Sequence, residues 1–124
     1  MPRPAKRRRL WRWRDNYRLL FRRPAMFLRL YYVPLVVLAF GAVLDAASTA
    51  YVMEAYGIEG ELHPMIRLLA RHLGIAAGVT AGKVIQVALA VLVAAAWRKW
   101  CAFLLTLSGV LYLLAAAWNY YAHP

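Results

Sequence analysis

The sequence contains very little cysteine and very little acid. Its 124 residues include a single cysteine, Cys101, which excludes an internal disulfide and a zinc site built from cysteines. Only five Asp or Glu residues stand against 16 Lys or Arg. The chain has no nucleophile–histidine–acid order, no glycine-rich phosphate loop and no HExxH sequence. We therefore expect no enzyme, no cofactor and no bound metal.

Apolar residues, by contrast, are abundant. Hydrophobic residues make up 64% of the chain, and the mean hydropathy of +0.50 is too high for an ordinary soluble domain. Three stretches are long enough to cross a bilayer, at residues 33–54, 74–97 and 100–122. The sequence thus predicts an all-α membrane protein with one domain of three transmembrane helices over residues 33–122.

The positive charge is concentrated in an N-terminal arm, residues 1–32. Eleven of the 16 Lys and Arg lie there, with Asp15 as the only acid. Arginines alternate with aromatic and aliphatic residues, which is typical of an amphipathic helix in the membrane interface, and Pro24 should break or restart that helix. We expect the arm to contact anionic lipid or a partner protein through Arg7, Arg8, Arg9, Trp11, Arg12, Trp13, Arg14, Arg22 and Arg23.

The basic residues also predict the orientation of the spans. The short turn at Arg98 and Lys99 makes the second and third spans antiparallel neighbours, and three spans place this turn on the same side as the arm. The positive-inside rule assigns that side to the cytoplasm and the C-terminus to the outside, as in a multi-pass protein of the bacterial inner membrane. Residues 57–73 then form an outer amphipathic segment, with a short helix that starts at Pro64.

Two charged residues lie deep within the apolar stretches, Asp45 in the first span and Lys83 in the second. A charge near the bilayer centre costs roughly 2.5–3.5 kcal/mol on insertion scales, so it is rarely left without a partner. Counted from the outer ends of the spans, both residues and Tyr112 of the third span lie at a similar depth. We predict that they belong to one polar network, formed by Asp45, Ser48, Thr49, Lys83, Gln86 and Tyr112.

Two interpretations of this network remain open at this point. A structural ion pair would only fix the register of the helices, whereas a ligand, proton or ion site would use the same charges for function. The outer segment adds a second polar site, because Glu59 and His63 lie four residues apart. A carboxylate and an imidazole suit a divalent cation when further ligands join them. A solvated Glu59 and a hydrogen-bonded His63 are the simpler expectation.

Small residues repeat along the second span. Gly74, Gly78 and Gly82 are spaced four residues apart, and such a stripe allows two helix backbones to approach closely. The first span offers a matching small surface at Gly41 and residues 46–48. We expect the stripe to pack on that surface within one chain, and homo-oligomerisation through the stripe is the alternative.

These residues together resemble a family of small multi-span membrane proteins of bacteria and archaea whose function is unknown. The resemblance covers about residues 33–120 and rests on Asp45-x3-Thr49, Gly57-x-Glu59, Pro64 and Lys83. It implies one shared site made of Asp45, Thr49, Glu59, Pro64 and Lys83, and it supplies no activity. This chain departs from the family pattern in a longer turn, with His63 where Asn is expected.

The sequence favours a non-enzymatic accessory or structural subunit of a larger inner-membrane assembly, because the chain is small and lacks catalytic groups. The main alternative is a small ion-, proton- or metal-handling membrane protein that uses the Asp45–Lys83 site. An enzyme acting on lipid within the membrane is a further alternative. So is a tether for nucleic acid or the ribosome, but basic residues beside a span are explained more simply by topology and lipid attraction.

Overall fold

The computed structural model describes residues 16–123. Residues 16–22 are helical, and the elements that follow are α2 (Pro24–Leu30), α3 (Tyr32–Tyr56), the 3-10 turn η1 (Ile58–Gly60), α4 (Pro64–Leu73), α5 (Ile75–Ala96), the 3-10 turn η2 (Arg98–Trp100) and α6 (Cys101–Ala122). Every regular element in this part of the chain is a helix, so the predicted all-α class is confirmed.

Three helices are long and apolar enough to span a membrane, namely α3, α5 and α6 with η2 before it. The chain is therefore a multi-pass membrane protein. α3 extends beyond both ends of the expected range 33–54, whereas α5 and α6 lie just inside the ranges 74–97 and 100–122. Gly57 and Gly74 end α3 and α4, because their φ angles of 93° and 89° are readily adopted only by glycine.

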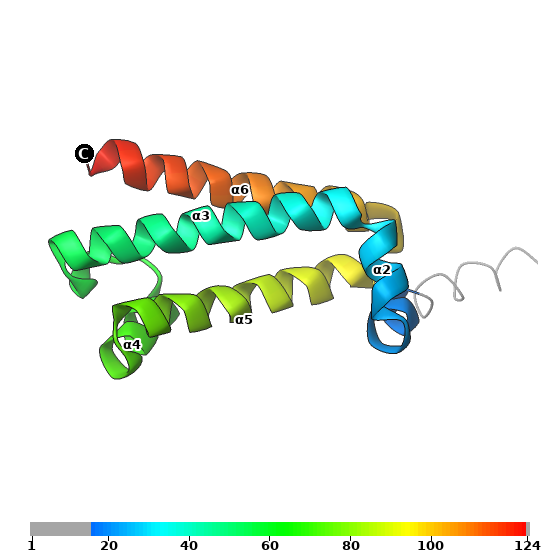
Figure 1. Ribbon diagram of the computed structural model, residues 1–124, viewed down its shortest axis with the longest axis horizontal. Coiled ribbons are helices and arrows are strands. Elements are labelled where there is room, and N and C mark those ends of the chain that lie inside the picture. Colours follow the sequence, from blue (N-terminus) through cyan, green and yellow to red (C-terminus); the bar gives the residue numbers. More distant parts are fainter. Residues whose placement is uncertain (1–15, 124) are drawn as a thin grey trace, which may run out of the picture.

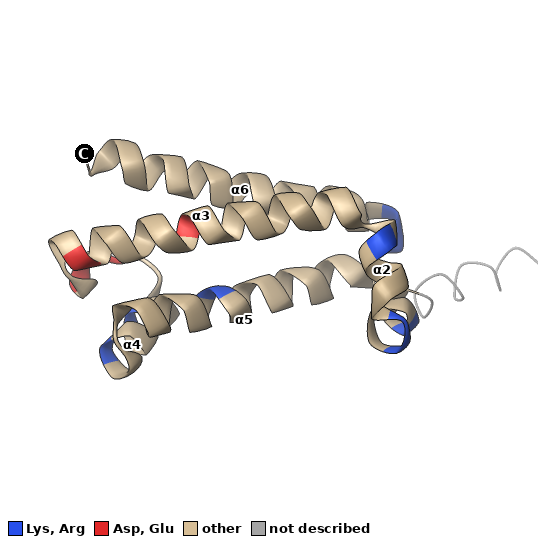
Figure 2. Ribbon diagram, viewed as in Figure 1, with Lys and Arg blue, Asp and Glu red and all other residues tan. Residues whose placement is uncertain are grey.

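The spans form a three-helix bundle with distinct ends (Figure 1). α3 lies most extensively against α6 and also contacts α5, and α4 folds back along the first half of α5. The end formed by residues 16–22, α2 and η2 is called the basic end. The end formed by η1, α4 and the C-terminus is called the glutamate end, because it holds Glu54, Glu59 and Glu61 (Figure 2).

The close contact between α3 and α6 is made by two glycines. A Cβ atom added to Gly109 of α6 would lie 2.7 Å from the backbone carbonyl carbon of Val37 on α3. A Cβ atom added to Gly41 would meet the backbone of Gly109 from the opposite side. The absence of both side chains allows the two backbones to touch, so the register of α3 against α6 depends on these positions.

The glycine stripe of α5 packs on α4, and its predicted contact with α3 is wrong. Gly78 faces the backbone of Ala70, and a Cβ atom added to Gly82 would lie 2.9 Å from Cγ1 of Ile66. The physical reason is local, since Gly74 turns the chain so sharply that α4 returns directly onto the small-residue face of α5. The amphipathic segment expected at residues 57–73 thus ends in a helix held by the bundle.

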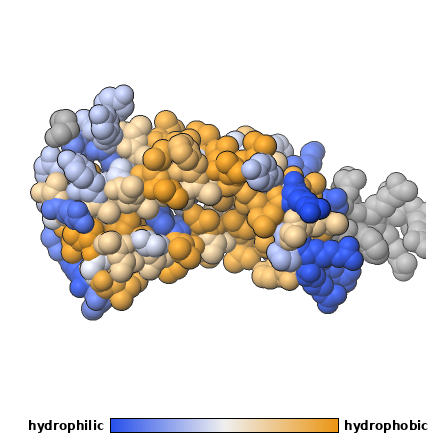
Figure 3. Space-filling view, in the orientation of Figure 1, coloured by the Kyte–Doolittle hydropathy of each residue, from blue (hydrophilic) through white to orange (hydrophobic). Residues whose placement is uncertain are grey.

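Two apolar clusters stabilise the bundle, one toward each end. The cluster toward the basic end contains Phe27, Tyr31, Leu38, Ala94, Ala95, Cys101 and Leu105. The cluster toward the glutamate end contains Met53, Ile66, Ala70 and Val79. Figure 3 shows the corresponding exterior, an apolar middle band between two hydrophilic ends. Along α3, the polar site described below lies between the two clusters.

The inner part of the N-terminal arm, from residue 16 onward, packs against the bundle, which the sequence did not predict. Arg23 interrupts the helix and Pro24 occupies the first turn of α2, as the sequence predicts. Phe27 and Tyr31 are buried in the cluster at the basic end. The pattern of alternating arginines indicated the outward face of this segment correctly, but it gave no sign of the buried face.

Hydrogen bonds from the arm also reach the backbone at the C-terminal end of α5. Asn16 is fully buried, and its Nδ2 donates to the backbone oxygen of Ala95 at 3.2 Å. The hydroxyl of Tyr31 donates to Oδ1 of Asn16 at 3.2 Å, and that of Tyr17 donates to the backbone oxygen of Leu92 at 3.0 Å. Ala95 lies in the last turn of α5, where intrahelical donors run out, and Leu92 lies one turn earlier. The arm therefore acts as a cap for the second span.

Candidate functional site

Asp45 of α3 and Lys83 of α5 form a buried ion pair. Nζ of Lys83 donates to Oδ2 of Asp45, and the two residues are only 9% and 4% exposed. Nζ also donates to Oε1 of Gln86, one turn further along α5, at 3.1 Å. The same ammonium group lies 4.8 Å from the ring centroid of Tyr112 on α6, a cation–π contact. Side chains of all three spans thus surround the positive charge.

A chain of hydroxyl and amide groups extends the network from Asp45 to α6. Oγ1 of Thr49 donates to Oδ1 of Asp45 at 3.4 Å, and the hydroxyl of Ser48 donates to the backbone oxygen of Asp45 at 3.0 Å. Nδ2 of Asn119 on α6 donates to Oγ of Ser48 at 3.1 Å and to Oγ1 of Thr49 at 3.2 Å. The network therefore connects α5, α3 and α6 without a break.

All six residues predicted for this network are brought together, and one further member was missed. Asn119 lies seven residues after Tyr112, which is two helical turns, so the two side chains share a face of α6. That spacing was a usable signal in the sequence. The aromatic residues beside Asn119 indicate a membrane boundary instead, and this second pattern obscures the first.

The depth of the pair explains why both charges need partners. Asp45 and Lys83 lie about 16 Å and about 12 Å along their helices from the glutamate end, at about 1.5 Å per residue. Water is excluded from the apolar middle of a bilayer, and an unpaired charge there is expensive. The structure satisfies this requirement with an opposite charge, a carbonyl oxygen and an aromatic face. Chemically, the site can hold three helices in register or accept a proton or cation when the pair opens.

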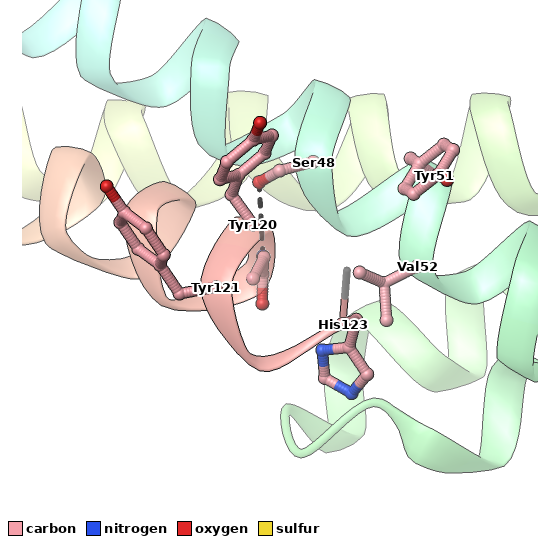
Figure 4. Close-up of a pocket in the computed structure, with 7 residues that line it drawn as sticks. Ser48, Tyr51, Val52, Tyr120, Tyr121 and His123 are labelled. Atoms are coloured by element: carbon pink, nitrogen blue, oxygen red, sulfur yellow. Dashed lines mark hydrogen bonds between the residues drawn. The ribbon is translucent and has the colours of Figure 1, made fainter.

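A hollow of about 510 Å³ lies beside the network at the glutamate end (Figure 4). Its lining comes from α3 and from the end of α6, and consists of Ser48, Tyr51, Val52, Asn119, Tyr120, Tyr121 and His123. Ser48 and Asn119 belong to both the hollow and the network. Nδ1 of His123 is buried and has no hydrogen-bond partner among residues 16–123. Polar groups at the end of the bundle, among them His123, therefore share one hollow with Ser48 and Asn119 of the network.

The structure does not bring Glu59 and His63 together into an outer polar site. Nη2 of Arg71 donates to both carboxylate oxygens of Glu59, at 2.6 Å for Oε2, and this contact lowers the pKa of Glu59. The backbone N–H of His63 donates to Oε1 of Glu61 at 2.9 Å. Within residues 16–123, no group of three or more His, Cys, Asp or Glu residues could hold a metal ion.

Only two of the residues expected to contact lipid or a partner lie within the described chain. Arg7, Arg8, Arg9, Trp11, Arg12, Trp13 and Arg14 lie outside the described residues. Arg22 and Arg23 lie at the basic end and are exposed. No protein family, curated protein or solved structure matches this chain. The resemblance to a family of small membrane proteins thus stays a prediction.

Proposed function

We propose that this protein is a small, non-enzymatic subunit that supports a larger assembly in the bacterial inner membrane. The proposal rests on one contrast: the charges inside the spans are paired, whereas most apolar side chains of the spans are exposed. The charged groups within the spans are satisfied by each other. In the apolar windows of α3, α5 and α6, only 28%, 22% and 17% of the residues are buried within the chain. Broad apolar faces of a stable bundle are thus available to neighbouring membrane helices.

The charge distribution supports one orientation for this subunit. The basic end faces the cytoplasm under the positive-inside rule, and the C-terminus lies outside. Anionic lipids are then the second partner, because the arginines of the arm meet the negatively charged cytoplasmic leaflet. The hydrogen bonds from Asn16 and Tyr17 hold the inner part of the arm against the bundle.

The test is a mild-detergent purification of the tagged protein from cells that express it at its native level, followed by native mass spectrometry. We expect one discrete assembly with a constant ratio of partner to subunit. A folded chain that migrates alone or as a homo-oligomer contradicts the proposal. As a control, Glu61→Gln changes one residue of the turn between η1 and α4, outside the three candidate spans, and should leave the assembly unchanged.

A proton- or ion-handling role is the second candidate, and the hollow beside the network favours it. Asn119 connects that hollow through Thr49 to the carboxylate of Asp45. In proteoliposomes that contain a pH-sensitive dye, this role requires proton or cation flux that Asp45→Asn abolishes. Thr106→Ala is the matched control, because the Thr106 hydroxyl donates to the Ala102 carbonyl of its own helix and does not belong to the network. Flux equal to that of empty liposomes rules the role out.

A further inference from the structure

The helix α4 helps to build an apolar layer beside the ion pair, on the side toward the glutamate end. This layer consists of Met53 of α3, Ile66 and Ala70 of α4 and Val79 of α5, which form one packed cluster and are each no more than 2% exposed. Ala46 of α3, the residue after the aspartate of the ion pair, packs against the same cluster. Two of the four buried side chains in this layer therefore come from α4.

The spacing along the two spans places the apolar layer next to the two charges. Met53 follows Asp45 on α3 by two steps of four residues, and Val79 precedes Lys83 on α5 by one such step. Residues four apart are neighbours on one face of a helix. α3 ends and α5 begins at the glutamate end, so both steps lead from a charge toward that end. The layer thus lies between the ion pair and the water at the glutamate end.

The attachment of α4 to the bundle depends on few side chains. Only Ile66 and Ala70 of this helix are buried. Ile66 lies against Gly82, and a Cβ atom added to Gly78 would meet the backbone of Ala70. Arg71 adds one ion pair to η1, in which both side chains are exposed. Segments that are held by few buried contacts open more readily than the rest of a fold, so α4 can be released while the three spans stay folded.

We propose that α4 is a lid over the ion pair. In the closed position of the structure, its apolar face completes the layer that separates Asp45 and Lys83 from water at the glutamate end. The exposed contact between Glu59 and Arg71 is the latch that holds it closed. Release of the lid admits water to the two charges, and water weakens their attraction by raising the local dielectric constant. The lid goes beyond both functions proposed above, because it controls access to the pair whether the pair sets the helix register or handles protons.

The test measures whether water reaches a thiol under the lid. It uses the full chain in a neutral detergent and the variant Cys101→Ala/Val79→Cys, because Val79 belongs to the layer and lies one turn from Lys83. A small, water-soluble methanethiosulfonate modifies a thiol only where water reaches it. We expect the thiol at residue 79 to react at least about tenfold more slowly than an exposed thiol introduced by Gly60→Cys. Adding Gly78→Ala should raise its rate about tenfold or more, because the new methyl group pushes α4 off α5.

Each change to the lid has a matched control. Gly60→Ala adds the same methyl group where no atom lies within 4 Å, and it should change the rate by less than about twofold. Circular dichroism shows whether Gly78→Ala keeps its helix content. If it does not, Ile66→Ala decides the question, because it removes a buried side chain of the lid and should also speed the labelling. Its control is Leu68→Ala, which shortens a side chain of the same helix that is 55% exposed and should leave the rate unchanged.

Two results would overturn the proposal. A thiol at residue 79 that reacts as fast as one at residue 60, with the lid intact, would mean that the layer does not exclude water. Folded Gly78→Ala or Ile66→Ala variants that leave the thiol protected would mean that α4 is not the barrier. The latch is tested by Arg71→Gln, which should raise the rate about twofold to fivefold, since an exposed ion pair is weak. An unchanged rate would overturn the role of the Glu59–Arg71 contact as the latch.

Discussion

At the scale of single residues, the contact between Asp45 and Lys83 is the strongest constraint on this bundle. Each side chain is buried, and each has a second partner in addition to the opposite charge. In the apolar part of a membrane, removing one partner leaves the other charge without compensation. The pair therefore contributes more to the choice of helix register than to the net stability of the fold.

This argument predicts how substitutions of the pair combine. Lys83→Met should destabilise the protein by about 3–5 kcal/mol, because Asp45 is left buried without its partner. The double variant Asp45→Asn/Lys83→Met should be less destabilised than Lys83→Met alone, because neither charge remains. Unfolding in mixed detergent, followed by circular dichroism, measures both effects. Lys99→Met removes an exposed lysine and serves as the control, with a change within about 0.5 kcal/mol.

The two single substitutions and the double variant form a cycle that has a clear negative outcome. If the effects of Asp45→Asn and Lys83→Met simply add, the two side chains do not interact in the folded protein. In that case the ion pair would not set the register of α3 and α5. Additive effects would also remove the main reason for placing a functional site between these helices.

At the scale of whole elements, glycine determines which helices touch. Gly109→Ala should destabilise the bundle by about 1–3 kcal/mol, because the new methyl group meets the backbone of α3 and the helices must separate. Gly60→Ala is the matched control, since no atom lies within 4 Å of its added Cβ and its φ is not positive. Detergent unfolding of the two variants compares them directly, and similar stability would mean that α3 and α6 do not approach at Gly109.

The ion pair between η1 and α4 predicts a dependence on pH. Arg71 lowers the pKa of Glu59 below its ordinary value of 4.5. A lowered pKa in the folded state means that the contact stabilises at pH values above 4.5 and is lost as the pH falls below that value. The hydrogen-exchange protection factors of residues 58–73, which correct for the pH dependence of the intrinsic exchange rate, should therefore fall in acid, by a small factor because both side chains are exposed.

The control for this pH effect is the pair of variants Glu59→Gln and Glu54→Gln. Glu59→Gln should show the lower protection factors already at neutral pH and little further change of them in acid. Glu54→Gln removes an exposed glutamate in the last turn of α3 and should behave like the natural protein. If Glu59→Gln keeps the full acid response, another group causes it.

These elements also show how far the sequence alone can predict the structure. The spans and the Asp45–Lys83 pair were predictable, because hydropathy and the cost of a buried charge both act on short stretches of sequence. The partner of the glycine stripe was not predictable, since a stripe shows only that some backbone approaches it. The burial of Asn16 was hidden for a similar reason. Its amide nitrogen donates to the backbone carbonyl of Ala95 in α5, which carries no side-chain signal in the sequence.

At the scale of the whole molecule, the protein is strongly polarised from end to end. The basic end collects the arginines of residues 16–23 and η2, and the opposite end holds all three glutamates of the described chain together with Arg67 and Arg71 of α4 (Figure 2). The two ends are separated by an apolar band (Figure 3). Such an arrangement should be inserted in one direction only, because basic residues next to a span resist translocation.

Site-directed labelling tests this direction, and the single natural cysteine makes the experiment simple. Cys101 is fully buried, so Cys101→Ala provides a background without thiols in the described chain. In that background, Lys99→Cys places a thiol at the basic end and Gly60→Cys places one at the glutamate end. In sealed right-side-out vesicles, a membrane-impermeant maleimide should label the thiol at residue 60 and spare the one at residue 99.

Inverted vesicles provide the control, because the pattern must reverse there: residue 99 becomes labelled and residue 60 protected. Labelling of both sites in both kinds of vesicle would mean that the chain inserts in two directions. A reversed pattern in right-side-out vesicles would place the basic end on the outer side. The anionic leaflet that faces the cytoplasm would then be out of its reach, so one experiment on the whole molecule also constrains which lipid the basic end can meet.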